Sequence, residues 1–356
     1  MDDHAADPRA DPRADQGLEW ATDQVAAAAQ LACLLEASAP KPGNVSPGRH
    51  FHDTRYEDFL ASACAIGPAL GRAGERPLGL TILAAVRATR PWTRSNTNLG
   101  IVLLLAPLAT AALAARPGGP PHRDDNVPRP DPRTPSPPGG AHPPAPADSH
   151  LPGGRATVGG AAALRARLAH VLAATTVRDA EALYEAIRLA RPGGLGSAPA
   201  QDVRERPTVT LVEAMALAAE RDGVAREYAT GFASTFEVGR PALARARADG
   251  LAWDDAVVEA YLALLAAAPD TLLARKGGAA AAAEVQRLAH EAVAAGGVRS
   301  ADGRRLVEAL DVRLRDARNA SNPGTTADLT ASAIFVHLLD GGWPSPEDRS
   351  HEHADG

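Results

Sequence analysis

The chain has 356 residues, enough for one large domain or two ordinary ones and for a sizeable hydrophobic core. Its 37 basic and 43 acidic residues give a net charge of −6, so we expect neither nucleic acid nor an anionic membrane as a partner. Aromatic residues make up only 4% and alanine is abundant, which favours helices over strands. Residues 1–16 are polar and lack the apolar core of a secretory signal. Cys33 and Cys64 lie in apolar helical patterns, so we expect two buried thiols in a cytoplasmic protein.

Apolar residues recur at helical spacing along most of the chain, and no alternating run of useful length indicates a strand. The pattern predicts helices at 18–37, 56–70, 79–89, 99–115, 160–175, 178–191, 208–222, 224–238, 240–249, 253–268, 278–295, 302–319 and 325–340. The segment 99–115 is uncharged, but it is short for a membrane span and contains Pro107, so we expect a buried core helix. The predicted fold is all-α.

The composition changes sharply at residues 117–156, where thirteen of forty residues are proline and large apolar side chains are nearly absent. Such a segment cannot bury enough surface to offset the entropy of ordering it. We therefore predict a single-domain multi-helix bundle over 17–342, interrupted by a disordered insertion at 117–156. Residues 1–16 and 343–356 are predicted to be loose tails.

The sharpest motif is Asn322-Pro323-Gly324-Thr325-Thr326-Ala327-Asp328, where a Pro-Gly turn opens a helix that is apolar almost all round. Free backbone N–H groups, the hydroxyls of Thr325 and Thr326 and a positive dipole end make a ready phosphate site. Asp328 is expected in the first helical turn. There it either holds a magnesium ion beside the phosphate or complements the helix dipole.

Lysine is rare in this chain, since 35 of its 37 basic residues are arginines. Lys41 lies in a loop stiffened by two prolines, Pro40-Lys41-Pro42-Gly43-Asn44, and Lys276 lies in a glycine-rich turn expected at 270–278, after Arg275. A lone lysine in an arginine-dominated sequence suggests a compact point charge for a ligand phosphate. The other interpretation is that Lys276 is an ordinary cation at a helix end.

Three further segments carry polar groups that suit a ligand. Asn96 and Asn98 precede the apolar helix and either cap it or contact phosphate or ribose. A glycine-rich loop at 192–196, followed by Asp202, ends another helix but lacks the Gly-Lys-Ser/Thr of a Walker loop. Asp53 follows two histidines in a loop, a pattern that is more typical of solvated side chains than of a metal site.

Taken in order, these motifs resemble the triphosphoribosyl-dephospho-CoA synthase family. The resemblance rests on Glu36 with Lys41-Pro42-Gly43, Asp53, Asn96-Thr97-Asn98-Leu99-Gly100, Asp270-Thr271 with Arg275-Lys276-Gly277, and the segment 322–329. It covers residues 18–342 apart from the insertion. Asn98-Leu99 stands where typical members have His-Lys, and Asn44 replaces a hydrophobic residue. The chain is therefore similar to a divergent branch found in archaea and in bacteria with tetrahydromethanopterin-type cofactors.

The resemblance implies an all-helical transferase that joins the triphosphoribosyl part of ATP to dephospho-CoA and releases adenine. Displacement at ribose C1′ needs a carboxylate near the developing positive charge. We expect Asp53, Asp270 and Asp328 as the catalytic candidates, and Asp202 and Asp328 as ligands of Mg²⁺. Nucleotide-binding candidates are Lys41, Asn44, Asn96, Asn98, Arg275, Lys276, Gly324, Thr325 and Thr326.

Alternatives to this function stay open at the level of sequence. One is a related enzyme of one-carbon cofactor assembly that uses another phosphorylated substrate, and another is a nucleotide-binding protein without catalysis. The sequence also leaves a homo-oligomer open.

Overall fold

The computed structural model describes residues 20–114, 160–315 and 321–343, which belong to one compact helical unit. These residues contain no β-strand, only one isolated bridge between Ser46 and Arg49, so the all-α prediction is confirmed. The α-helices are α1 (Thr22–Ser38), α2 (Tyr56–Gly71), α3 (Leu78–Thr89), α4 (Leu99–Leu113), α5 (Gly160–Ala173), α6 (Val177–Ala190), α7 (Leu211–Ala218), α8 (Gly223–Thr230), α9 (Arg240–Ala248), α10 (Trp253–Ala267), α11 (Thr271–Gly277), α12 (Ala279–Ala294), α13 (Ala301–Leu314) and α14 (Gly324–Leu339). Short 3-10 segments form η1 (Ala73–Glu75) and η3 (Gly297–Arg299), and a π-helical segment forms η2 (Ser234–Gly239).

Side-chain caps fix several helix ends. The Thr210 hydroxyl accepts a hydrogen bond from the Glu213 backbone N–H, and the Glu213 carboxylate accepts one from the Thr210 N–H, which is a reciprocal capping box at the start of α7. After α14, Gly341 has φ 79°, a left-handed conformation that suits glycine.

Helix α11 was not predicted, because residues 270–278 were interpreted as a turn. The Asp270 carboxylate accepts a hydrogen bond from the Leu273 N–H at 2.9 Å and starts this seven-residue helix. A helix so short shows no amphipathic period, so the cap was its only sequence signal. The predicted helices 208–222 and 224–238 are also divided differently, into α7, α8 and η2.

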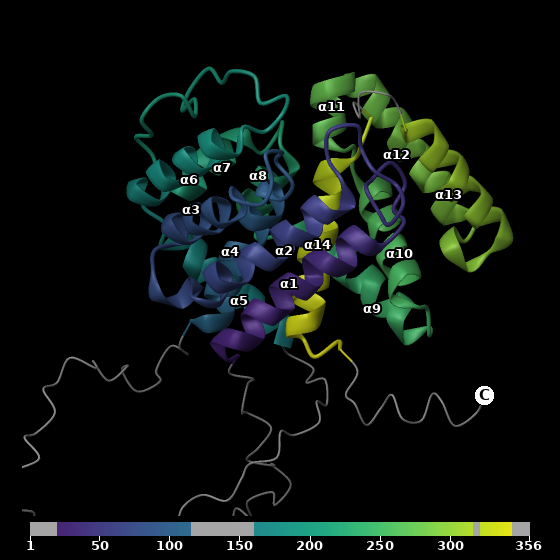
Figure 1. Cartoon of the computed structure of the whole chain (residues 1–356), viewed down its shortest axis with the longest axis horizontal. Helices are drawn as coiled ribbons and strands as arrows, with labels where there is room; N and C mark the ends of the chain where they lie inside the picture. The colour runs from purple at the N-terminus through teal and green to yellow at the C-terminus, as the bar shows by residue number, and fades with distance from the viewer. Residues whose placement is uncertain (1–19, 115–159, 316–320, 344–356) are drawn as a thin grey trace, which may run out of the picture. The chain divides into compact units, whose positions relative to one another are not determined.

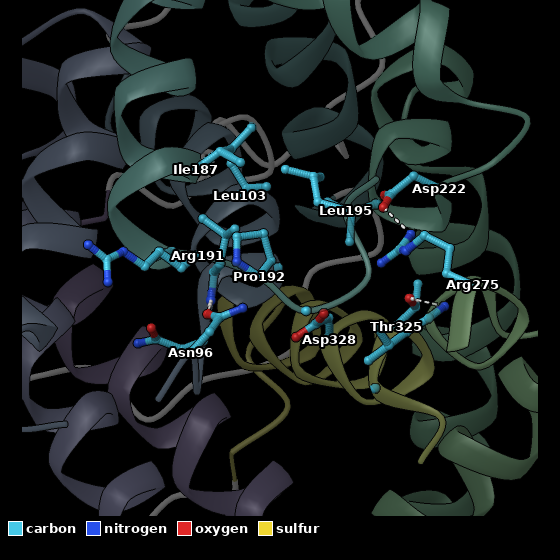
Figure 2. A pocket seen from close by; sticks show the side chains of 18 of the residues that line it. Asn96, Leu103, Ile187, Arg191, Pro192, Leu195, Asp222, Arg275, Thr325 and Asp328 are labelled. Atoms are coloured by element: carbon cyan, nitrogen blue, oxygen red, sulfur yellow. Dashed lines mark hydrogen bonds and ion pairs between the residues drawn. The ribbon is translucent and has the colours of Figure 1, made fainter. Parts of the chain in front are cut away.

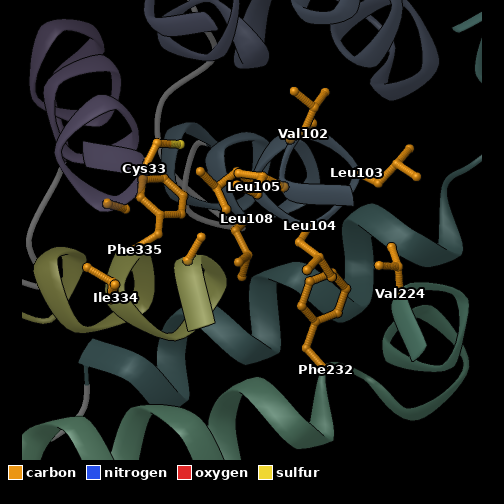
Figure 3. Packing of buried hydrophobic residues seen from close by; sticks show 14 of the residues in the cluster. Cys33, Val102, Leu103, Leu104, Leu105, Leu108, Val224, Phe232, Ile334 and Phe335 are labelled. Atoms are coloured by element: carbon orange, nitrogen blue, oxygen red, sulfur yellow. The ribbon is translucent and has the colours of Figure 1, made fainter. Parts of the chain in front are cut away.

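Helix α4 lies at the centre of the unit and packs against α1, α3, α5 and α14. Figure 3 shows Leu105 and Leu108 facing Phe335 of α14, while Leu104 faces Phe232. All these side chains are buried, as expected for a core helix that is apolar all round. Among the described residues no single helix is long and apolar enough to cross a membrane, although the bent pair α10 and α11 passes by length and composition. The cytoplasmic location stays a prediction.

The other buried helix, α14, runs between the first and last parts of the unit. It packs against α1 and α4 and also against α9 and α10 (Figure 1). Its N-terminal end therefore lies where helices from distant parts of the sequence meet, close to α8 and α11. The candidate site lies at this junction.

The two cysteines differ from the prediction. Cys33 is buried, but Cys64 is exposed, and both are free thiols. The predicted tail 1–16, the insertion 117–156 and most of 343–356 lie outside the described residues. The domain boundaries stay predictions.

Candidate active site

A cavity of about 580 Å³ opens beside the N-terminal ends of α4 and α14. The end of α1, helices α6, α7, α8 and α11, and the loops around residues 53, 95 and 195 complete its wall. This volume falls within the roughly 300–1,000 Å³ range of small-molecule sites. All the predicted site residues line the cavity except Lys41, Asp270 and Thr326.

The start of α14, expected to bind phosphate, is already capped by a carboxylate of the protein. The Thr326 backbone N–H and hydroxyl donate to Asp270 Oδ2 at 2.7 and 2.8 Å, and Asp270 Oδ1 accepts from the Leu273 N–H. Burial raises the pKa of Asp270 despite these donors. Thr325 does line the cavity, but its hydroxyl accepts from the Leu272 N–H at 3.2 Å. One carboxylate thus joins the starts of α11 and α14, and little donor capacity remains there for a ligand.

The Pro40–Asn44 loop is also bonded internally. Lys41 is 0% exposed, and its Nζ lies 3.0 Å from Glu36 Oε1. The same ammonium donates to the carbonyl oxygens of Glu36 and Ala39. Asn44 lines the cavity, yet its amide donates to Pro42 O and to the Tyr261 hydroxyl. The charged group presented to the cavity here is therefore Glu36, near the end of α1, which the sequence analysis did not select as a site residue.

Asp328 points into the cavity from α14 (Figure 2). It is the fifth residue of the helix, which begins at Gly324, so the expectation that it lies in the first turn is wrong. Its carboxylate makes no hydrogen bond or ion pair with any described residue. Burial, followed by the nearby charge of Glu36, raises its pKa well above the usual range.

Asp328 lies against the first turn of α4, where residue 100 must lack a side chain. A Cβ built on Gly100 would lie 2.0 Å from Asp328 Oδ2. Glycine here allows the carboxylate to approach the helix backbone. In the same segment, the Asn96 side chain accepts a hydrogen bond from the Leu99 N–H at 3.0 Å, so it caps α4. The amide nitrogen of Asn98 is buried and has no partner among the described residues.

The glycine-rich loop after α6 is held by Asp202. Its carboxylate accepts hydrogen bonds from the Ala198 N–H and from the Arg204 backbone and guanidinium. The Arg204 guanidinium, with these donors, holds the pKa of Asp202 well below its usual range. Asp202 is therefore engaged in shaping the loop. Asp53, at another part of the wall, is largely exposed and accepts a hydrogen bond from the Thr54 hydroxyl.

Five cationic side chains line the cavity, and the exposed ones mark its mouth. Arg94, Arg191 and Arg221 line the cavity, and their guanidinium groups make no hydrogen bond or ion pair within the described segments. Arg275 also lines it and pairs with Asp222 at 2.6 Å (Figure 2), while Lys276 Nζ donates to Asn322 at 3.0 Å. The three unpaired arginines were missed because nothing in the sequence distinguishes them among 35 arginines.

No group of three or more His, Cys, Asp or Glu side chains in the described part of the chain has the arrangement of a metal site. A magnesium ion here would need most of its ligands from phosphate oxygens and water, which is how proteins commonly hold it. Asp328 is the carboxylate with oxygens open to such an ion, whereas those of Asp202 already accept four hydrogen bonds.

The structure thus defines an all-helical unit whose cavity combines unpaired arginines with an open carboxylate. The family to which this chain belongs is ATP:dephospho-CoA triphosphoribosyl transferase (CitG), whose model matches residues 22–347.

Proteins assigned as 2-(5''-triphosphoribosyl)-3'-dephosphocoenzyme-A synthases are similar over part of the chain. One from Pseudomonas paraeruginosa is 40% identical over 125 residues, which cover 34% of this chain and 42% of that protein. One from Pseudomonas fluorescens is 32% identical over 120 residues, covering 34% and 40%. The matched chain thus spans less than half the length of these relatives.

A solved structure extends the similarity to the whole fold. The crystal structure of a protein from Archaeoglobus fulgidus, assigned as a triphosphoribosyl-dephospho-CoA synthase, is 27% identical with a TM-score of 0.53. The match covers 80% of this chain and 99% of that one.

Proposed function

We propose that this chain transfers the triphosphoribosyl group of ATP to dephospho-CoA and releases adenine. The observation that carries the proposal is the trio Arg94, Arg191 and Arg221, which line the cavity without ionic partners. Guanidinium groups match phosphate oxygens in charge and geometry. Family membership then selects a nucleoside triphosphate among polyanions of suitable size.

The distribution of charge supports one orientation of the nucleotide. The three arginines are exposed, whereas Glu36 is buried to 4% exposure and Asp328 is half-buried against Gly100. A triphosphate held at the mouth directs the attached ribose toward these carboxylates. Negative charge near ribose C1′ stabilises the cationic transition state that forms as adenine departs.

Magnesium belongs to the same proposal. Burial raises the pKa of Asp328, and a divalent cation between this side chain and the triphosphate favours its ionised form and removes the repulsion between the two anions. Asp328 supplies one protein oxygen, and phosphate and water supply the rest. Asp202 contributes by holding the loop at 192–204 rather than by ligating the ion.

The direct test incubates the purified protein with ATP and Mg²⁺, with and without dephospho-CoA, and measures free adenine by chromatography. We expect adenine in proportion to the dephospho-CoA consumed. If adenine forms only with a different phosphorylated acceptor, dephospho-CoA is not the acceptor, although ATP is still the donor. Absence of adenine with every acceptor would leave a nucleotide-binding protein.

A second measurement tests nucleotide binding alone. A ligand that binds only the folded state stabilises it by about 2.7 kcal/mol at a hundredfold excess over Kd. We expect ATP with Mg²⁺ to raise the Tm. A melting curve that millimolar nucleoside triphosphates leave unmoved contradicts the proposal.

A further inference from the structure

The buried pair Glu36–Lys41 has a structural peculiarity that stability alone does not explain. Both side chains are almost fully removed from water, at 4% and 0% exposure. A buried ion pair contributes little to stability, because the desolvation of two charges offsets their attraction, and an apolar pair of similar volume often does as well. The chain keeps a buried charge pair at the wall of its cavity, where a charge has a use.

The hydrogen bonds of Lys41 show which member of the pair faces the ligand. Its ammonium contacts Glu36 Oε1, Glu36 O and Ala39 O, so its three N–H donors are all used by the protein. Lys41 does not line the cavity, but Glu36 does. The second carboxylate oxygen, Oε2, makes no hydrogen bond with the described residues. Lys41 therefore holds Glu36 as a carboxylate with one oxygen directed by the protein and one left for a ligand.

The neighbourhood of Glu36 is matched to a cation rather than to phosphate. Asp328 lines the same cavity, and the charge of Glu36 helps to raise its pKa. The unpaired arginines that suit phosphate lie at the exposed mouth instead. A nucleotide bound with its triphosphate at the mouth places its sugar, the part that becomes positively charged, toward this pair.

We infer that Glu36 is a catalytic residue that accepts the proton of the attacking acceptor hydroxyl at Oε2, while its charge faces ribose C1′, and that Lys41 is its positioning residue. The inference rests on the proposed function. In the step, the acceptor oxygen forms a bond to C1′ as the C1′–N9 bond breaks. The electron pair of the broken bond goes to the purine, which takes a proton from solvent and leaves as adenine. The hydroxyl proton passes to Glu36 and then to solvent, so the protons balance.

The main test compares Glu36→Gln with the wild type in adenine release from ATP and dephospho-CoA. Loss of a positioned acid–base group typically lowers turnover by about a hundredfold to ten-thousandfold, and we expect kcat to fall in that range. The KM for ATP and the ATP-dependent rise in Tm should stay close to wild type, because the arginines at the mouth are unchanged. A folded Glu36→Gln variant that keeps more than a tenth of wild-type kcat overturns the inference.

Removing one member of a buried ion pair leaves the other charge buried without a partner, which can prevent folding. A second variant therefore removes both charges. The double change Glu36→Gln with Lys41→Met leaves no buried charge and is expected to fold and remain inactive. Turnover near wild type in this variant also contradicts a catalytic Glu36.

Chemical rescue separates catalysis from packing. Glu36→Ala leaves a space beside the Lys41 ammonium that a formate ion fits in size and charge. We expect formate to raise kcat of Glu36→Ala, whereas formate should not raise kcat of Glu36→Ala combined with Lys41→Met, which has the same space but lacks the ammonium. No rise in the single variant, or equal rises in both, counts against the assignment. Should the wild type itself release no adenine, the proposed function fails, and that result is distinct from any of these.

Discussion

Two regions at the heart of this molecule carry polar side chains but use them differently. At the start of α14, Thr326 and Asp270 bond to each other, so the motif closes on the protein itself. Along the cavity wall, Asp328 and Arg221 have no partners of opposite charge among the described residues. A motif of polar residues therefore indicates a junction of chain segments when its groups are satisfied, and a ligand site when they are not.

The largest effect on turnover is expected at the cavity wall, at Asp328. We expect Asp328→Asn to lower turnover about a thousandfold, or about 4 kcal/mol of transition-state stabilisation, because the Mg²⁺–triphosphate loses its protein ligand. The Tm should not fall, since the carboxylate that is removed is half-buried and has no hydrogen-bond partner among the described residues. Calorimetric titration of ATP with and without Mg²⁺ measures the cause.

Asp53→Asn is the matched control, because Asp53 also lines the cavity but is largely exposed. Equal losses in the two variants would show that any carboxylate of the wall serves. Unchanged Mg²⁺-dependent affinity in Asp328→Asn refutes the metal role.

His337 tests whether an unsatisfied polar group always means a ligand. Its Nε2 is buried without a partner, yet it lies at the far end of α14 beside Trp253, outside the cavity. Burial, with the positive charge of Arg240, lowers the pKa of His337 to about 4. Because the folded pKa is depressed, the stabilisation is complete above pH 6.5 and is lost as the pH falls toward 4.

The pKa shift corresponds to about 3 kcal/mol of unfolding free energy, at 1.36 kcal/mol per unit. Denaturant melts of the wild type and His337→Leu across that pH window measure it. We expect the free energy of unfolding of the wild type to fall as the pH is lowered through this window, and that of His337→Leu to change less. ATP affinity should be the same in both proteins. Identical pH dependence of the unfolding free energy in the two proteins would show that His337 does not cause the acid sensitivity.

At the start of α14, where Asp270 and Thr326 bond to each other, Asp270→Asn should lower the stability of the fold rather than the rate of the reaction. The amide offers N–H donors where Oδ2 now accepts from Thr326, and an unsatisfied buried donor costs about 1–3 kcal/mol. We expect the free energy of unfolding to drop by about 2 kcal/mol, with turnover per folded molecule nearly unchanged. A stable but inactive Asp270→Asn would restore Asp270 to the catalytic candidates.

The sequence predicted the helices well where they bury an apolar stripe or are apolar all round, as in α4 and α14. It failed at α11, whose seven residues carry no period and depend on a tertiary cap. For the site, the order of the motifs located the segments that line the cavity. It could not say that Lys41 turns away into the protein while Glu36 turns toward the cavity, because both lie within six residues and only packing decides their directions. Nor could it single out Arg191 and Arg221, which lie after the ends of α6 and α7.

The smallest effect is expected at the arginines of the mouth, and it tests their assignment most sharply. Arg221 has no ionic partner among the described residues, so Arg221→Ala removes no internal contact of its guanidinium. If the triphosphate binds there, the variant loses one charge-assisted contact, about 1.4 kcal/mol or tenfold in Kd for ATP. The loss should shrink as salt is added, because exposed charges are screened.

A general reduction of positive charge would produce a similar trend, and Arg178→Ala controls for it. Arg178 is an exposed residue of α6 that does not line the cavity, and its replacement changes the net charge equally. We expect ATP affinity within about twofold of wild type for Arg178→Ala and a KM effect without a kcat effect for Arg221→Ala, because the mouth binds ground state and transition state alike. If both variants raise the Kd for ATP to the same degree, the effect comes from the net charge of the protein. Arg221 then does not bind the triphosphate. If Arg221→Ala lowers kcat instead, the arginine reaches the reacting centre and the proposed orientation of the nucleotide is reversed.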